Sequence, residues 1–431
     1  MTTTSTPGPT RSTAEGATTA TGRITLLVAL AVFAQESTWN FYDSQVPPLL
    51  REHLASAALV GLLMGMDNLL GIFVQPWIGN RSDATRTRWG RRLPYLVVGM
   101  PVAAVLFVLV PHAARSLLPL VAVMFAYALV LNSLNPVSTS LLPDFIGPQR
   151  RSRANAVVKI ATSLTIIVAA LVSVLVVDDH PYVAFAIPAA IMLVAVVVLA
   201  ATVRDSESPA YRAALEEDTA EAGQEVARPR ARDAVRDILR DRDRSRLMLL
   251  LAILLFGAAW ASSRALLTPY GQEALGLSRG DAGGLTLPSG IAFLLAAYPA
   301  ALLAERLGRL RVMLAGMSVF GLALVGGTLV QTPTGTVVAF VVAAAGASGF
   351  MINAVVVLWN FAPSPNLLGT YAGLYTVGWA SGGFLGPALV GGMVDLTGWD
   401  LMLLDIALLT GLAVLVVARL ARAQRRAPTL P

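Results

Sequence analysis

The sequence predicts an all-α membrane protein with about twelve membrane-spanning helices. Of its 431 residues, 55% are hydrophobic and only 13% are charged, and the mean hydropathy is +0.67, values far from those of a soluble domain. Apolar runs of about 20 residues, the length that crosses a bilayer, recur along the whole chain. Because every backbone polar group in lipid needs an internal partner, these runs must be helices packed in a bundle.

The expected spans are separated by short polar turns, except for one longer polar stretch in the middle of the chain. They cover residues 24–46, 56–78, 93–112, 117–139, 154–177, 181–203, 247–269, 283–303, 311–331, 335–361, 369–394 and 400–420. Residues 204–246 are rich in Arg, Glu, Asp and Ala and contain no spanning run, which indicates a cytoplasmic linker. Its end, DAVRDILRDRDRSR, predicts a short helix at the membrane surface.

The linker divides the chain into two bundles of six helices, residues 23–203 and 247–421. Residues 1–22 are rich in Thr, Ser and Ala, and we expect a disordered cytoplasmic tail there. Residues 422–431 are expected to form a second cytoplasmic tail.

Arginines gather in the turns after spans 2, 4 and 8 and are sparse in the opposite turns. The positive-inside rule therefore places these three turns and both termini in the cytoplasm. We expect an integral, multi-pass protein of the plasma membrane. The net charge of +6 follows from this topology, so a nucleic-acid partner is not expected.

Metal and enzyme chemistry have little support in the sequence. The chain has no cysteine and three histidines, all of which fall in predicted outer loops, so neither a metal site nor a cofactor is expected. No nucleophile motif is present either, and we expect a protein that is not an enzyme.

The two bundles repeat each other at a fixed spacing. Trp39 and Trp260 are 221 residues apart (260 − 39), and so are Asp43 and Arg264 (264 − 43). A parallel repeat of six spans is typical of transporters that bind substrate between two rocking halves.

Three stretches resemble one transporter family. The run VQPWIGNRSDATRTRWGRRLPY, residues 74–95, is similar to the loop between spans 2 and 3 of the sucrose:proton symporters, and WNFYDSQVP in span 1 and LLPDFIGPQRRSRANA, residues 141–156, resemble the same branch. This branch is the glycoside-pentoside-hexuronide:cation symporter group of the major facilitator superfamily. The resemblance implies the two-bundle fold of that superfamily and coupled transport of a sugar. In the sodium-using melibiose branch two acids stand on span 2, at the positions of Gly71 and Gln75 here, so a proton is the expected coupling ion.

The arginine-rich loop also predicts a cytoplasmic latch that breaks when the halves rock. Asp83 can bond Arg91 or Arg92 and nearby helix N-termini. Asp144, near Arg151 and Arg153, is a candidate second latch. The complete set is Gly79, Asp83, Arg88, Gly90, Arg91, Arg92, Asp144, Arg151 and Arg153, with Glu305, Arg306 and Arg309 at the repeated position. The alternative is that the arginines set topology alone and that Asp144 lies in a solvated loop.

Two acids, Glu36 and Asp67, lie near the middle of their spans. Because a mid-bilayer charge costs about 2.5–3.5 kcal/mol, we expect these acids to carry the coupled proton or to bind substrate. The alternative is a structural hydrogen bond. Lys159, the only lysine, lies closer to the cytoplasm and either binds substrate or extends to the surface. Asp405 is expected to be structural.

Spans 1, 4, 7 and 10 line the cavity in the superfamily, and they carry amides and rings that suit a sugar. The candidate substrate residues are Trp39, Asn40, Tyr42, Asn132, Lys159, Trp260, Asn353, Trp359 and Asn360. The alternative is that the rings mark the bilayer interface and the amides tie helices together.

Asp43 and Arg264 occupy equivalent positions in the repeat and so lie at the same depth, in the outer third of the bilayer. We expect an ion pair between them that closes the outer side when the transporter faces inward. The alternative is that each side chain acts locally.

These expectations describe a monomeric secondary active transporter that takes up a sugar, a glycoside or a disaccharide such as sucrose, with protons. Its partners are then a small-molecule substrate, protons and the lipid bilayer. One alternative is a proton-antiport exporter of drugs or natural products. Such exporters usually carry a Gly-Pro-rich motif in span 5, where this chain has neither residue, but a similar string, GGFLGPALVGG, residues 382–392, occurs in span 11 and leaves the alternative open. Another is a membrane scaffold or sensor that transports nothing.

Overall fold

A computed structural model of the chain describes residues 11–220, 244–361 and 368–426. These residues form helices and turns with no strand, and 12 of the helices are long and apolar enough to cross a membrane. The predicted all-α fold with about twelve spans is therefore confirmed.

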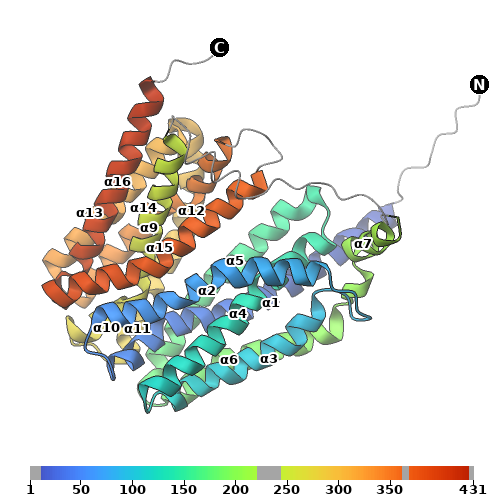
Figure 1. Cartoon of the computed structure of the whole chain (residues 1–431), viewed down its shortest axis with the longest axis horizontal. Coiled ribbons are helices and arrows are strands. Elements are labelled where there is room, and N and C mark those ends of the chain that lie inside the picture. The colour runs from blue at the N-terminus through green and yellow to red at the C-terminus, as the bar shows by residue number, and fades with distance from the viewer. Residues whose placement is uncertain (1–10, 221–243, 362–367, 427–431) are drawn as a thin grey trace, which may run out of the picture.

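The helices form two halves that lie side by side in Figure 1. The first half contains α1 (Arg11–Arg51), α2 (Ala57–Asp83), α3 (Leu93–Ala113), α4 (Leu117–Phe145), α5 (Pro148–Val172), a π-helical turn (Ser173–Val177) and α6 (Pro181–Thr202). A 3₁₀ turn (Asp205–Glu207) and α7 (Pro209–Ala220) follow. The second half contains α9 (Ser245–Ala265), α10 (Leu267–Glu273), α11 (Arg279–Gly284), α12 (Leu287–Leu307), α13 (Arg309–Val330), α14 (Pro333–Asn360), α15 (Leu368–Thr397), a 3₁₀ turn (Trp399–Leu401) and α16 (Met402–Arg426).

Both ends of the described chain are more helical than the sequence predicted. Helix α1 begins at Arg11, inside the expected tail of residues 1–22, and α16 continues to Arg426. Residues 1–10 and 427–431, and most of the predicted surface helix of 233–246, lie outside the described residues.

Each half has its own aromatic core. In the first half, the ring of Phe41 meets that of Phe185 edge-on at a centroid distance of 5.0 Å. In the second half, Phe256 lies 4.6 Å from Phe350 and 5.3 Å from Phe320. Because lipid tails are as apolar as these rings, the cores hold together through close packing.

The halves meet most closely where α2 packs against α15. Gly61 faces the backbone of Pro387, and Gly65 faces the backbone of Phe384, with no room for a side chain at either glycine. Small residues allow two helix backbones to approach in this way. This glycine contact holds the halves together near one end of the bundle.

That end is the arginine-poor end, opposite the arginine-rich end at which α2, α4 and α12 finish. Here the carboxylate of Asp395, on α15, accepts hydrogen bonds from the Ser56 hydroxyl at 2.6 Å and from the backbone N–H groups of Ala57 and Ala58 at 2.6 and 3.1 Å. Asp395 thus caps the first turn of α2 from the other half, with a charge that suits a helix N-terminus.

Further polar bonds join the halves at the same end. Arg51 pairs with Glu273 at 2.8 Å, and the Arg279 guanidinium donates to the Gln45 side chain at 2.8 Å. Asp178 accepts hydrogen bonds from the Ser278 hydroxyl at 2.6 Å and from a backbone N–H of the second half at 2.8 Å. The conformation is therefore closed at the arginine-poor end.

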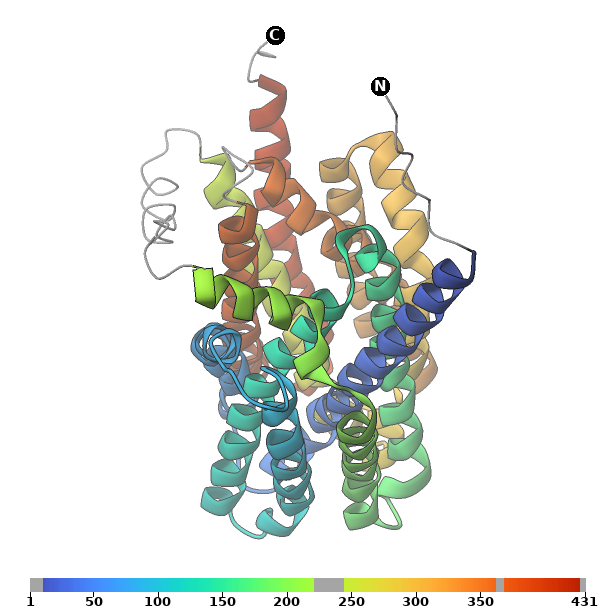
Figure 2. The same ribbon diagram turned by 90° about the vertical axis from the view of Figure 1, so that its right-hand side faces the viewer.

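At the arginine-rich end, residues that follow α6 form hydrogen bonds to the turn between α2 and α3. The carboxylate of Asp205, fully buried, accepts hydrogen bonds from the backbone N–H groups of Arg92 and, at 3.2 Å, Leu93, and so caps α3. Gly90 has a φ of 99°, and a Cβ there would overlap the Asp205 carboxyl. The Tyr211 hydroxyl donates to the same turn, and Figure 2 shows its helix α7, in yellow-green, lying across this end of the bundle.

The glycine contact between α2 and α15 gives a first prediction. In Gly61→Val, the added side chain overlaps the Pro387 backbone, and overpacking of this kind costs about 1–3 kcal/mol. Because the overlap exists only while the halves are closed at this end, we expect the variant to populate a form that is open there. Spin labels on cysteines placed at Arg115 and Thr334, both exposed at the arginine-poor end of a chain without native cysteine, will report a longer distance.

Gly326→Val is the matched control, because nothing lies within 4 Å of a Cβ at Gly326. An unchanged distance distribution in Gly61→Val would show that this contact does not control closure.

Asp205 gives a second prediction, on pH dependence. Burial raises the pKa of the Asp205 carboxyl, while hydrogen bonds from backbone N–H groups oppose that rise. A raised folded-state pKa contributes stability at acid pH that is lost as pH rises through it. Asp205→Asn keeps an oxygen acceptor but cannot ionise, so its melting temperature should fall less than that of the wild type between about pH 4 and pH 7.

The exposed Asp179 provides the control variant, Asp179→Asn, for which we expect the wild-type pH profile. Identical pH profiles in the wild type and Asp205→Asn would contradict the assignment.

Candidate functional site

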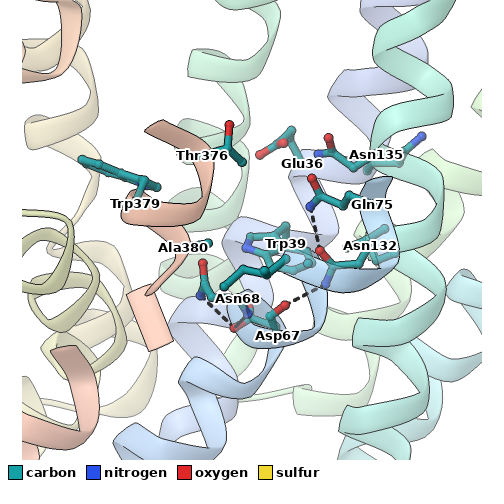
Figure 3. A pocket seen from close by; sticks show the side chains of 14 residues that line it. Glu36, Trp39, Asp67, Asn68, Gln75, Asn132, Asn135, Thr376, Trp379 and Ala380 are labelled. Carbon is teal, nitrogen blue, oxygen red and sulfur yellow. Dashed lines mark hydrogen bonds between the residues drawn. The ribbon is translucent and has the colours of Figure 1, made fainter. Parts of the chain in front are cut away.

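Three adjoining cavities of about 330, 320 and 220 Å³ lie between the halves, and Glu36 lines all three. Figure 3 shows the first of them, with Gln75 and Asn132 on one side and Thr376 and Trp379, from α15, on the other. Together the cavities form a polar region in the middle of the bundle, with walls from both halves. This region is the candidate site.

Asp67 is held in place by amide groups. It is only 3% exposed, yet it lines two of the cavities. Its Oδ1 accepts hydrogen bonds from the backbone N–H of Asn68 at 2.7 Å and from the Asn68 side chain at 2.9 Å. The Asn132 amide donates to the Asp67 carbonyl oxygen at 3.0 Å, which ties α4 to α2 at this level. Glu36 and Asp67, the two acids predicted near the middle of their spans, thus both line the central cavities.

The amide chain continues toward the arginine-rich end. The Gln75 amide donates to Asn132 Oδ1 at 2.8 Å. Gly71 leaves room for this bond, because a Cβ there would come within 2.7 Å of the same Oδ1. Gly71 and Gln75 occupy the two positions that carry acids in the sodium-using melibiose branch. In this chain, hydrogen-bonded amides take up that space instead.

Arg264 reaches into the site from the second half. Its guanidinium donates to Asn40 Oδ1 at 2.8 Å, and the Asn40 amide donates to the Thr165 hydroxyl at 2.8 Å. Asp43 lines the same cavity, but the described residues show no ion pair between Asp43 and Arg264. The predicted gate pair is therefore not formed in this closed conformation, because Arg264 bonds α1 at Asn40, about one helical turn before Asp43.

Aromatic rings from both halves flank the cavities. Trp39 on α1 and Trp379 on α15 line the same two cavities, and Trp260 on α9 lines the second and third. Trp379 stacks on Tyr375 with a centroid distance of 6.2 Å and an interplanar angle of 17°. Flat apolar surfaces therefore stand beside the carboxylates and amides.

Two predicted substrate residues belong instead to the cores of their halves. Tyr42 is 2% exposed and stacks on Tyr127 at 5.2 Å. Asn353 is 3% exposed, and its amide donates to the Gly349 carbonyl of its own helix at 2.9 Å. Neither lines the three cavities in this conformation.

Three others lie nearer the arginine-rich end. Lys159 is exposed and does not line the described cavities. Trp359 is 39% exposed, also outside them. Asn360 lines a separate pocket beside the turn between α12 and α13. Because the last turns of α14 extend beyond the central cavities, the substrate roles predicted for its Trp359 and Asn360 are not supported.

The sequence reasoning missed several residues of the site. Asn68 adjoins the predicted Asp67, and Gln75 lies in the run of residues 74–95 that resembles the sucrose:proton symporters. Gln35 lines the first cavity and donates to the Ser138 hydroxyl. Trp379 stands in a glycine-rich span, where nothing in the sequence marks it as facing the cavity.

The latch residues form an ionic network inside the first half. Arg91 binds Asp144 through two nitrogens, at 2.6 and 3.1 Å, and Arg92 binds the same carboxylate at 3.0 Å. Arg92 also pairs with Asp83 and bonds Ser82. The acid Asp144 was predicted to meet Arg151 and Arg153, whose side chains lie outside the described residues; its partners here are Arg91 and Arg92. The network joins the turn between α2 and α3 to α4.

The other latch positions have varied surroundings. The Arg88 guanidinium lies 5.8 Å from the ring centroid of Trp89, and a Cβ at Gly79 would lie 4.0 Å from Pro136. At the repeated position in the second half, Glu305, Arg306 and Arg309 line the pocket that also contains Asn360. These three form no ion pair with another described residue.

Comparison with solved structures supports the same fold. A bacterial homolog of the human lysosomal transporter Spinster, in an inward-facing and occupied conformation, superposes with a TM-score of 0.72 at 14% identity and covers 94% of this chain and 97% of that chain. The nucleoside transporter NupG superposes with a TM-score of 0.70 at 14% identity, over 93% of this chain and 99% of that chain. At such identities the likeness shows the fold alone.

Curated relatives match over short stretches. The sucrose transport protein SUC4 of Arabidopsis thaliana is 29% identical over 92 residues, 21% of this chain and 18% of that protein. The uncharacterized symporter sll1374 of Synechocystis is 32% identical over 112 residues, 23% of this chain and 21% of that protein. The membrane-associated transporter protein of Homo sapiens is 31% identical over 72 residues, 17% of this chain and 14% of that protein. The matched stretches therefore span only 14–21% of the length of these relatives.

The likenesses to SUC4 and to a symporter confirm the resemblance found in the sequence. The family model of the Major Facilitator Superfamily matches residues 28–294 and 273–431, which together cover nearly the whole chain. The chain belongs to the Major Facilitator Superfamily.

Proposed function

We propose that this chain is a secondary active transporter that takes up a sugar, such as a glycoside or disaccharide, together with protons. The observation that carries the proposal is the composition of the central cavities, where Glu36 and Asp67 stand beside Trp39 and Trp379, one ring from each half. A site shared by both halves can open to each side in turn when they rock. The short matches to SUC4 and to a symporter support the same substrate class and coupling.

A sugar presents hydroxyl groups around its rim and an apolar C–H face. The amides of Asn68, Asn132 and Gln75 supply both donors and acceptors for hydroxyls. The rings of Trp39 and Trp379 supply flat surfaces for the C–H face. Because the carboxylates Glu36, Asp43 and Asp67 all face these cavities, an uncharged sugar suits them better than an anionic one.

Proton coupling needs a carboxyl group that faces the substrate cavity and that can exchange a proton with either side of the membrane. Moving one charge through 100 mV is worth about 2.3 kcal/mol, equal to a concentration ratio of about 50. Glu36, which lines every one of the three cavities, and Asp67, which is buried beside two of them, are the proposed proton carriers.

Alternating access follows from the asymmetry of the contacts between the halves. The present conformation is closed at the arginine-poor end, and the positive-inside rule assigns the arginine-rich end to the cytoplasm, with both termini. We propose that the network of Asp83, Asp144, Arg91 and Arg92 is the inner latch, and that it rearranges when the arginine-rich ends approach. The proposed setting is a monomer in the plasma membrane.

The string GGFLGPALVGG is the feature that left the exporter alternative open. Its glycines face other helices closely: Gly382 and Gly386 meet α9, at Leu254 and Ala258, and Gly391 meets α2, at Ala57. This packing accounts for the glycines without an exporter motif. Import of a sugar remains the proposal.

Uptake into proteoliposomes tests the proposal and the proton carriers together. With a panel of labelled sugars and an imposed pH gradient, we expect the wild type to accumulate a glycoside or disaccharide. Glu36→Gln and Asp67→Asn should lose accumulation against the gradient, by about 50-fold for 100 mV, because neither can carry a proton. Both should keep exchange of sugar down its own gradient.

The control is Asp405→Asn, which changes a buried acid that bonds Thr397 and lies away from the cavities. Accumulation by both Glu36→Gln and Asp67→Asn would rule out these two acids as carriers. Proton release on addition of a hydrophobic drug, with no sugar transported, would instead support the exporter.

The two rings predict a specific loss of affinity. Trp39→Ala and Trp379→Ala remove a surface on which the sugar stacks, and each should raise the KM for sugar on the order of tenfold, whereas Trp→Phe at either position should retain most of the affinity. Trp77→Ala serves as the control, because Trp77 lies on α2 and is 61% exposed. If both Ala variants transport with the KM of the wild type, the rings do not contact the substrate.

A further inference from the structure

A second polar pocket lies outside the central cavities, at the arginine-rich end of the second half. It encloses about 710 Å³ between the turn that joins α12 to α13, the end of α14 and the end of α16. Its lining includes Arg306, Arg309 and Arg311, with Glu305 as the only acid, and the amides of Asn360 and Gln424. The transport cycle proposed above gives this pocket no role.

The charge of the pocket differs from that of the equivalent turn in the first half. There, Arg91 and Arg92 are neutralised by Asp83 and Asp144. In the second half, Arg306, Arg309 and Arg311 form no ion pair with any described residue. Three cations thus stand around one cavity with a single acid, an arrangement whose net charge attracts an anion.

The turn itself adds donors to the same pocket. Gly308, with a φ of 92°, precedes α13 and supplies no side-chain acceptor to the first turn of that helix. The N-terminus of α13 therefore contributes its partial positive charge beside the three guanidinium groups. Guanidinium groups bind phosphate oxygens through paired hydrogen bonds, which a spherical anion such as chloride cannot use.

The remaining lining is apolar, from Leu307, Leu310, Val357 and Phe361. Leu307 is 52% exposed, at the end of a helix that crosses the membrane. A phosphate group attached to an apolar body would therefore contact both kinds of surface. Basic pockets between membrane helices recognise lipid head groups by this combination.

We propose that this pocket binds a phosphate mono- or diester, supplied by an anionic membrane lipid or by a soluble phosphate compound. Arg306, Arg309 and Arg311 hold the phosphate oxygens, and Asn360 and Gln424 donate to neighbouring oxygens. The site is independent of the sugar cavity, so it stands whether or not the proposed substrate is right.

The test measures retained lipid by native mass spectrometry and melting temperature in detergent, with phosphatidylglycerol, phosphatidylcholine or inorganic phosphate added to the full chain. We expect phosphatidylglycerol to bind and to stabilise the protein, and phosphatidylcholine to do neither. Arg306→Gln/Arg309→Gln should weaken phosphatidylglycerol binding by about 30-fold. The matched control, Arg419→Gln/Arg422→Gln, removes two exposed charges of α16 that do not line the pocket and should bind like the wild type.

Competition by inorganic phosphate separates the two sources. Stabilisation by inorganic phosphate at low concentration, lost in the pocket variant, assigns the site to soluble phosphates; stabilisation by phosphatidylglycerol alone assigns it to lipid. Arg306→Lys/Arg309→Lys keeps the charge and should retain part of the binding, which shows that the Gln variant has not simply unfolded. Equal binding by the pocket and control variants, or equal binding of phosphatidylcholine, would overturn the proposal.

Discussion

The close approach of α2 and α15 is the contact on which the arrangement of the site depends. Gly61 and Gly65 let the two backbones touch, and the same seam continues to Gly383, where a Cβ would overlap the Asn68 side chain. Asn68 bonds Asp67, and Trp379 lies about one helical turn from Gly383 along α15. Gly61 and Gly65, which allow one end of the bundle to close, therefore also set the distance between the Asp67 carboxylate of the first half and the Trp379 ring of the second. A rocking motion that opens this seam must change the site at the same time.

The two halves are related by the repeat, but they contribute groups of opposite charge to the site. Glu36, Asp43 and Asp67 all come from the first half, whereas the cation Arg264 comes from the second. At the arginine-rich end, Arg91 and Arg92 pair with acids of their own half, whereas Arg306, Arg309 and Arg311 form no ion pair with any described residue. Polar contacts such as Arg51 with Glu273 and Arg264 with Asn40 join the halves, and they favour association where a hydrophobic driving force is absent.

The sequence predicted the helices, their number and the acids of the site, because apolar length and the cost of an intramembrane charge are properties of single segments. It could not predict which way each polar side chain turns. Asn132 and Asn353 are 221 residues apart (353 − 132), the spacing of the repeat. Yet Asn132 also bonds across to α2, in the space left by Gly71, whereas Asn353 bonds only its own helix among the described residues. The position of Tyr42 outside the cavity could nevertheless have been predicted from the sequence. At about 100° per residue, Glu36 and Asp43 share a face of α1, and Tyr42 lies on another face.

The partner of Arg264 bears on how the site can carry a proton. A carboxylate held in a direct ion pair keeps its charge and is a poor proton carrier, because protonation would leave the cation unpaired. Here Arg264 bonds the neutral amide of Asn40, which in turn is fixed by Thr165. Among the described residues, Arg264 therefore forms no direct ion pair with Glu36, Asp43 or Asp67, the three carboxylates that line the same cavity. The amide of Asn40 thus takes the bond that joins Arg264 to the first half, and the proposed proton carriers stay outside a direct ion pair.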